Sequence, residues 1–248
     1  MKPSAGLLAL FISLLAIAPA RAQPASLIIL CTQALRTSLL ELAPRFEQRS
    51  GMKIDLAIAP SGKLVERVRG GEYVDLLIAN APNIDSLIQD GKVAGARIDL
   101  ARAEVGLSVR AGATKPDISS AEAVKRVLLA AKAVAWSPGG LSGTIFEAAL
   151  DKLGITAEVK AKAKLGAPAA AFVARGEADI AAQQISELIA VAGADLVGPL
   201  PPELGGTTRF SLGILAQAPQ ADAARAFAAY LRSEEASRVI REKGLTPG

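Results

Sequence analysis

The sequence predicts an α/β protein of two lobes, each built on a parallel-rich sheet, with a ligand cleft between the lobes. Short apolar runs alternate with amphipathic helical stretches, which is the pattern of parallel strands covered by helices. The alternation breaks once near Ala103, where "RIDLARAEVGLSVRAG" contains two extended runs without a helix between them, and then it resumes. We therefore expect the chain to cross from one sheet to another near this point.

Residues 1–22 have the pattern of a cleavable secretory signal peptide. Lys2 is the basic region, residues 6–17 form the apolar region, and an A-x-A cleavage motif ends at Ala22. A membrane anchor is the alternative, but a spanning helix needs about 20 apolar residues, and this run is followed too early by a proline and an arginine. We expect the mature protein to begin at Gln23 in the periplasm.

The first unit is predicted to alternate strands and helices in the order β-α-β-α-β-α. The expected strands are 26–30, 53–58 and 75–78, and the expected helices are 35–49, 62–69 and 83–89. Apolar residues such as Leu35, Leu39, Leu42 and Phe46 recur at helical spacing in the first helix. Gly51 is a typical helix stop and ends it.

The second unit repeats this alternation after the crossing run, which ends at Ala111-Gly112. Ser119 or Ser120 is expected to cap its first helix, with Glu122 in the first turn. The expected helices are 119–131, 142–153, 167–175 and 186–191, and the expected strands are 133–136, 159–165, 179–182 and 210–215. Helices 221–231 and 234–243 close the chain and can return to the first unit. We accordingly assign 23–103 and 214–248 to lobe 1 and 104–213 to lobe 2.

Composition excludes several classes of function. The chain contains no histidine, which removes the usual zinc ligand and the base of a serine–histidine triad. Loss of Lys2 and Arg21 with the signal peptide lowers the formal charge from +4 to +2, and no basic run with interleaved aromatic residues indicates nucleic-acid binding. Cys31 is the only cysteine, so no intrachain disulfide forms, and its place in an apolar strand indicates a buried small hydrophobe.

Three polar turns follow predicted strands and open predicted helices. A helix N-terminus presents unpaired N–H groups and a partial positive charge, so such a turn at the carboxyl end of a parallel strand can bind an anion. Each turn could instead be an ordinary N-cap. None of them contains a carboxylate, which favours an anion over a metal cation. The three turns are Thr32-Gln33-Ala34, Ser61-Gly62-Lys63 and Ser142-Gly143-Thr144.

Other polar residues near these turns have two interpretations each. Gln183 and Gln184 follow a predicted strand, and they could donate amides into the cleft or lie in a solvated loop. Lys63 could neutralise a bound anion or lie in solvent, whereas Arg67 and Arg69 are interpreted as solvated. No P-loop occurs, and the G-x-G-x-x-G spacing of dinucleotide-binding proteins is not met.

Four stretches together resemble the molybdate-binding periplasmic proteins of ABC importers, a branch of the type II substrate-binding proteins. The order and spacing of these stretches over nearly all of the mature chain carry the resemblance. They are "LLELAPRFEQRSGMKIDLAIAPSGKLVERVRGGEYVDLLIAN" (39–80), "AVAWSPGGLSGTIFEAALDKLGI" (133–155), "VARGEADIAAQQISEL" (173–188) and "FAAYLRSEEASRVIREKGL" (227–245).

The resemblance implies a type II periplasmic binding protein fold that holds a tetrahedral oxyanion by serine hydroxyls, backbone N–H groups and a tyrosine hydroxyl. Ser61 matches the serine of the second turn, and Ser142 falls where the family donates a backbone N–H. The first-turn serine falls on Ala34, the tyrosine falls on Gln184, and Asn80 replaces a small residue. The scaffold therefore matches the family while the binding positions depart from it.

The resemblance implies a monomeric solute-binding protein without a cofactor that captures a molybdate- or tungstate-like oxyanion by hinge closure and delivers it to an ABC permease. The departures favour an alternative with the same role but an organic di- or tricarboxylate as ligand. An exported enzyme on the same fold and an effector-sensing module are further alternatives. No metal site is expected apart from a metal within the oxyanion. The expected ligand-binding residues are Thr32, Gln33, Ala34, Ser61, Gly62, Asn80, Ser142, Gly143 and Gln184.

Overall fold

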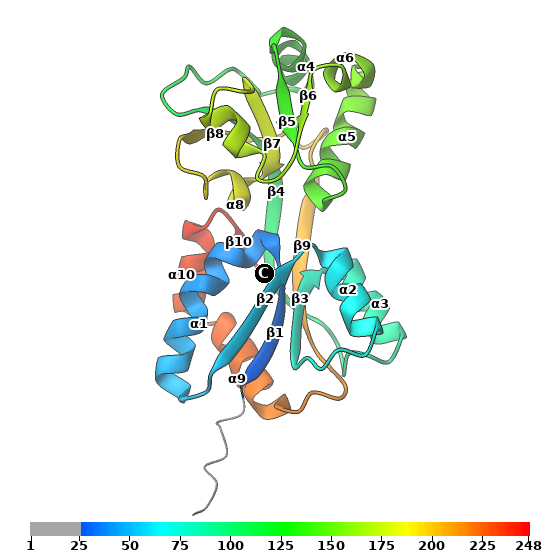
Figure 1. Cartoon of the computed structure of the whole chain (residues 1–248), viewed down its shortest axis with the longest axis vertical. Helices are drawn as coiled ribbons and strands as arrows, with labels where there is room; N and C mark the ends of the chain where they lie inside the picture. Colours follow the sequence, from blue (N-terminus) through cyan, green and yellow to red (C-terminus); the bar gives the residue numbers. More distant parts are fainter. Residues whose placement is uncertain (1–25) are drawn as a thin grey trace, which may run out of the picture.

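A long strand, β4 (Ile98–Arg110), runs from one half of the molecule to the other in the computed structural model, which describes residues 26–248 (Figure 1). Its first half pairs with β9 (Thr207–Ile214), and its second half pairs with β7 (Ile180–Gln184) and β8 (Ala194–Pro199). The predicted signal peptide lies outside the described residues. Within residues 26–248, no helix is long and apolar enough to cross a membrane.

The first lobe is built on a sheet in the order β2-β1-β3-β9-β4. Strands β1 (Leu27–Thr32), β2 (Ile54–Ala59) and β3 (Leu76–Asn80) are parallel, and β9 runs antiparallel to β3. A short strand, β10 (Thr246–Pro247), pairs with β4. Because the parallel strands are in register, with Thr32 opposite Ala59, their carboxyl ends meet at one edge of the sheet.

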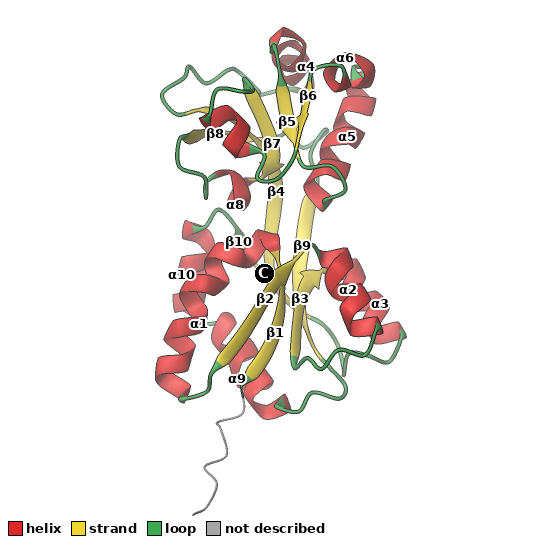
Figure 2. Cartoon of the chain, viewed as in Figure 1, coloured by secondary structure: helices red, strands yellow, loops and turns green. Residues whose placement is uncertain are grey.

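Helices cover both faces of the first sheet (Figure 2). The 3₁₀ helix η1 (Gln33–Leu35), α1 (Arg36–Ser50), α9 (Ala221–Leu231) and α10 (Glu234–Glu242) bury one apolar cluster with the sheet. The second cluster lies under α2 (Ser61–Arg69) and α3 (Ala81–Gln89). The buried carboxylate of Asp75 accepts backbone N–H groups from Ile28 at 2.8 Å and Gln220 at 2.7 Å, so it fastens the segment before α9 to the first strand.

The second lobe continues the sheet in the order β4-β7-β5-β6, with β8 also paired to β4. Strands β5 (Val134–Trp136) and β6 (Ala163–Leu165) are parallel to each other, and β5 is parallel to β7. The core contains Trp136 against Phe146, whose ring centroids are 5.5 Å apart. The helices of this lobe are α4 (Ala121–Ala130), α5 (Leu141–Leu153), α6 (Thr156–Lys160), α7 (Ala170–Ala174) and α8 (Ile185–Leu188).

The predicted α/β fold with two lobes is confirmed, and four details differ. The strand expected at 159–165 begins with helix α6, because Val159 packs into the second-lobe core, and only its last three residues are extended. The two extended runs at the crossing are one strand, β4. Strands β8 and β10 were not predicted. All of β9 pairs with first-lobe strands, so residues 207–213 lie in the first sheet and not with lobe 2 as expected.

Candidate functional site in the cleft between the lobes

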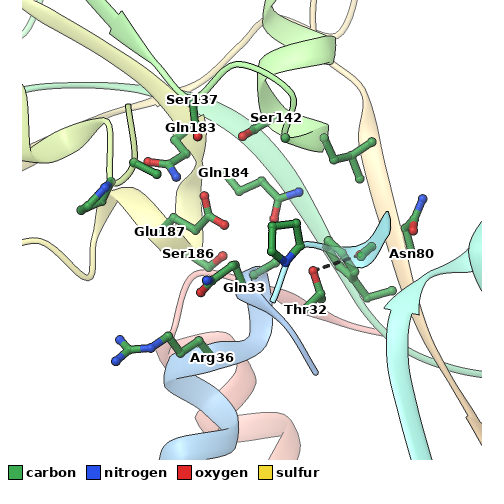
Figure 3. A pocket seen from close by; sticks show the side chains of 18 of the residues that line it. Thr32, Gln33, Arg36, Asn80, Ser137, Ser142, Gln183, Gln184, Ser186 and Glu187 are labelled. Carbon is green, nitrogen blue, oxygen red and sulfur yellow. Dashed lines mark hydrogen bonds between the residues drawn. The ribbon is translucent and has the colours of Figure 1, made fainter. Parts of the chain in front are cut away.

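The carboxyl ends of the parallel strands of both lobes border one cavity of about 640 Å³ that opens to solvent. The first lobe contributes the turns after β1, β2 and β3, and the second lobe contributes the turn after β5, the end of β7 and helix α8. Figure 3 shows polar side chains from both lobes around this space. Ligand sites of open α/β sheets lie at this position, outside the carboxyl ends of the strands.

Eight of the nine residues expected to bind ligand line the cavity. Gly143 does not: it packs behind the wall, where a Cβ atom would lie 2.1 Å from the carbonyl oxygen of Ser137. Glycine at this position therefore lets the first turn of α5 approach the turn that follows β5. The eight lining residues are Thr32, Gln33, Ala34, Ser61, Gly62, Asn80, Ser142 and Gln184.

The first two turns are joined by a hydrogen bond between side chains. The hydroxyl of Ser61, the first residue of α2, donates to the hydroxyl of Thr32 at 3.0 Å. Thr32 is the last residue of β1 and is 6% exposed. This bond places two hydroxyl groups from different turns at one end of the cleft.

The helices that begin at the cavity have no side-chain cap. The N-cap positions of α2, α3 and α5 are Pro60, Asn80 and Gly140, and none of them caps its helix through a side-chain hydrogen bond. Away from the cavity, Ser120 and Ser233 do cap α4 and α10. Thr32, the N-cap of η1, likewise makes no side-chain cap bond. The interpretation of the polar turns as ordinary N-caps is therefore wrong, and the first N–H groups of these helices have no side-chain cap as acceptor.

Three buried polar atoms of the cavity wall have no hydrogen-bond partner: Asn80 Oδ1, Gln184 Oε1 and Ser186 Oγ. Gln184 and Ser186 are only 3% and 2% exposed. Buried polar groups in proteins are almost always paired, because an unpaired one costs about 1–3 kcal/mol. The clustering of unpaired atoms at one cavity indicates that a ligand or its water completes them.

Two charged residues, Arg36 and Glu187, line the cavity in the part of the chain that the structure describes. Burial raises the pKa of the Glu187 carboxyl from 4.5 to about 7, and a hydrogen bond from Gln183 partly opposes this rise. Lys63 does not line the cavity: its ammonium group lies in solvent and pairs with Glu66 at 2.9 Å. The suggestion that Lys63 neutralises a ligand is therefore wrong, and Arg36 is the cation near the site.

Gln183 is held in one orientation. Its Oε1 accepts the backbone N–H of Ala169 at 2.9 Å, so its NH₂ group is available to donate to the Glu187 carboxyl. Gln183 and Gln184 are the last two residues of β7 and are both buried, which rules out the solvated-loop interpretation of this pair.

Several residues that line the cavity were not predicted from the sequence, among them Arg36, Ser137, Ser186 and Glu187. Arg36 fell within the expected helix 35–49 and Ser186 and Glu187 within the expected helix 186–191, and no role was predicted for any of them. The available signal was closeness in sequence, since Ser186 and Glu187 lie two and three residues after Gln184, which was already a candidate.

Neither a thiol nor a carboxylate cluster offers alternative chemistry here. Cys31 is fully buried in the first-lobe core, and burial raises the pKa of its thiol far above the usual range. Among residues 26–248, no group of three or more His, Cys, Asp or Glu side chains could hold a metal ion. The site therefore consists of helix N-termini, hydroxyls and amides, with one cation and one carboxyl.

Comparison with known proteins identifies the family. The model of the family described as bacterial extracellular solute-binding protein matches residues 27–246. The chain belongs to this family. The solute-binding protein is 35% identical to a protein from Pseudomonas sp. named aconitate isomerase, and the match covers 100% of this chain and 98% of the relative.

Solved structures share the fold of this solute-binding protein. The periplasmic molybdate-binding protein of Azotobacter vinelandii superposes with a TM-score of 0.72 at 19% identity, covering 89% of this chain and 99% of that one. The sulfate-binding protein of Mycobacterium tuberculosis superposes with a TM-score of 0.70 at 19% identity, covering 90% and 86% of the two chains. The two-lobed fold is thus one that binding proteins for inorganic oxyanions also have.

Proposed function

We propose that this solute-binding protein captures a small organic polycarboxylate of the aconitate class between its two lobes in the periplasm. The observation that carries the proposal is the set of neutral hydrogen-bonding groups around the cavity, which extends from the hydroxyls of Thr32 and Ser61 across to the buried amide of Gln184. The relative named aconitate isomerase supports the choice of carboxylate.

The charge of the cleft supports an anionic ligand. Uncapped N-termini of α2, α3 and α5 each supply partial positive charge, and Arg36 supplies a full one. A polycarboxylate has several separated negative groups, and these helix N-termini come from both lobes. Closure of the lobes on such a ligand would bring the groups of both walls to it at once.

The size of the cavity and its donor types favour an organic anion over a tetrahedral oxyanion. A cavity of about 640 Å³ lies within the roughly 300–1,000 Å³ of pockets for small organic ligands. The resemblance to molybdate-binding proteins places Ala34 and Gln184 where that family has a serine and a tyrosine hydroxyl. Two hydroxyl donors of a tetrahedral site are therefore missing, and an amide with an unpaired oxygen replaces one of them.

Isothermal titration calorimetry tests this proposal. The ligands are cis-aconitate, trans-aconitate, citrate, molybdate, tungstate and sulfate, each titrated into the purified protein. We expect an aconitate isomer to bind at least tenfold more tightly than any of the inorganic oxyanions. Preference for molybdate or tungstate would refute the polycarboxylate proposal and restore the oxyanion alternative, in which the protein serves an ABC permease.

Isomerisation of aconitate is a second candidate function. The relative's name supports it, and so does the presence of a carboxyl group, Glu187, in the wall of an otherwise anion-binding cleft. Incubation of the protein with one aconitate isomer, followed by chromatography or proton NMR, tests this candidate. Conversion to the other isomer supports it, and an unchanged isomer at high protein concentration refutes it.

A further inference from the structure

A cleft that only binds an anion has no use for a negatively charged carboxyl group such as that of Glu187 in its wall. Glu187 is the single carboxyl among the cavity-lining residues that the structure describes, and like charge near a bound anion weakens binding. The helix that carries it, α8, packs on η1, β4, β7 and β8. None of the charged residues on those elements lines the cavity, and Arg36, directly after η1, is the charged group that shares the cavity with Glu187.

The surroundings of Glu187 fit a group that both takes up and releases a proton. Burial raises the pKa of its carboxyl to about 7, so both protonation states are populated near neutral pH. General acid–base catalysis is most effective when the pKa of the group lies near the working pH. The chain contains no histidine, the residue that most often has this role.

The side-chain amide of Gln183 lies beside this carboxyl and favours its ionised form. Oε1 of Gln183 accepts the backbone N–H of Ala169 at 2.9 Å, so the side-chain NH₂ group of Gln183 is the donor available to the Glu187 carboxyl. Figure 3 shows the Glu187 side chain within the cavity view, between Gln183 and Ser186. A carboxyl group that borders a ligand cavity can reach a ligand bound there, which proton transfer requires.

We infer that Glu187 is the catalytic residue of an allylic proton shift that interconverts aconitate isomers in this cleft. The inference rests on the proposed function, which is that the cleft binds aconitate. In the ionised form, the Glu187 carboxylate takes a proton from the methylene carbon of the ligand. The electron pair of that C–H bond forms a new double bond to the central carbon, and the original double bond opens towards the far carbon.

The protonated Glu187 then returns the proton to the far carbon. The double bond has moved by one position, no atom is gained or lost, and no oxidant or reductant is consumed. In the intermediate, negative charge spreads onto the carboxylate oxygens of the ligand. The N-termini of α2, α3 and α5 border the same cavity, and their partial positive charge can stabilise that negative charge. Arg36 also lines the cavity, with its side chain directed away from Glu187 in Figure 3. Gln183 is a positioning residue in this scheme.

The test compares wild type with Glu187→Gln in two assays, calorimetric binding of each aconitate isomer and NMR-monitored interconversion. We expect Glu187→Gln to bind aconitate within tenfold of wild type and to lose at least 100-fold in kcat, because general acid–base groups contribute about 10²–10⁴-fold. Glu177→Gln, an exposed glutamate of the same lobe that pairs with Arg175, is the matched control and should retain the wild-type rate.

The dependence of kcat/KM on pH gives a readout that a purely structural role would not move. A general base must be ionised, so the wild-type rate should rise as pH increases through about 7, where Glu187 loses its proton. Glu187→Gln should show no such rise in its residual rate. Glu187→Asp keeps a carboxyl group and should restore part of the lost rate, which separates loss of proton transfer from loss of folding.

The outcomes separate the inference from the proposed function. If wild type binds neither aconitate isomer, the proposed function fails. If wild type binds aconitate but does not interconvert the isomers, the inference is overturned while the binding proposal stands. If Glu187→Gln interconverts them at more than a tenth of the wild-type rate, the assignment of Glu187 is overturned while the activity stands.

Discussion

Replacement of Gly143 by alanine tests the close packing behind the ligand cleft. The new Cβ would lie 2.1 Å from the carbonyl oxygen of Ser137 and 3.1 Å from its carbonyl carbon, whereas ordinary contacts begin at 3.4 Å. Because the obstacle is backbone, the first turn of α5 must move by more than about 1 Å from the turn after β5 to relieve the overlap. The alanine variant should therefore be less stable, and its cleft wall should be displaced.

The size of the effect follows from two opposing contributions. Overpacking of this kind costs about 1–3 kcal/mol, and the higher helix propensity of alanine recovers about 0.5–1 kcal/mol. At the midpoints of these ranges the net loss is slightly above 1 kcal/mol, which corresponds to a decrease in Tm of about 2–5 °C for a chain of this size. Gly62→Ala is the matched control, since it occupies the same position after a serine in α2 and nothing lies within 4 Å of its Cβ site.

Fluorescence of Trp136, the only tryptophan of the chain, reports unfolding of the lobe that contains Gly143. Urea denaturation of the ligand-free protein followed at this fluorophore should show Gly143→Ala destabilised. Gly62→Ala should be unchanged, or stabilised by up to about 1 kcal/mol. Equal stability of wild type and Gly143→Ala would refute the packing that the structure shows between α5 and the Ser137 turn.

Three further predictions concern hydrogen bonds and pH. Ser61→Ala removes the bond to Thr32 and a hydroxyl from the cleft, so it should weaken ligand binding in calorimetry by about 1–2 kcal/mol, while urea denaturation shows stability within about 1.5 kcal/mol of wild type. Asp75→Asn leaves one of two buried backbone N–H groups without an acceptor and should lower the free energy of unfolding by about 2–4 kcal/mol, whereas the exposed Asp222→Asn should change it by less than about 0.5 kcal/mol. Burial raises the pKa of Glu187 from 4.5 to about 7, so the folded state holds this proton more tightly than the unfolded state and loses stability as pH rises across that interval. Glu187→Gln lacks this loss, so in urea denaturation it should be about 3 kcal/mol more stable than wild type at pH 8 and equal to it near pH 4. Equal stability at both pH values would show that burial does not perturb this carboxyl.

The two-lobed fold could be predicted because its signals are local. Apolar spacing in the stretch of α1 and the small-residue turn at Ser61 each specify an element within about ten residues of chain. Where the local signal is ambiguous, the prediction failed. Val159, Ala163 and Leu165 follow the period of a strand, but Val159 belongs to a short helix, because packing against the second-lobe core outweighs propensity.

The candidate site was predicted in part for the same reason. Residues that follow strands, such as Thr32, Ser61 and Gln184, could be placed at the sheet edge from the order of elements alone. Glu187 and Arg36 could not, because Glu187 lies on the short helix α8 and Arg36 is the first residue of α1, and charged residues at such positions are usually exposed to solvent. Their position in the cavity depends on how α8 and η1 pack against each other across the lobes.

The sequence by itself determined the α/β alternation, the crossing between two units and the polar turns at strand ends, because these features depend on the spacing of nearby residues. It also excluded histidine chemistry, which depends on composition alone. Only the tertiary structure decided that the helices at the cleft lack side-chain caps and that Gly143 supports the wall behind it. It also decided that Lys63 lies in solvent and that Glu187 faces the cavity with a raised pKa. Burial and orientation depend on contacts between residues far apart in the chain, and these contacts exist only once the two lobes are folded.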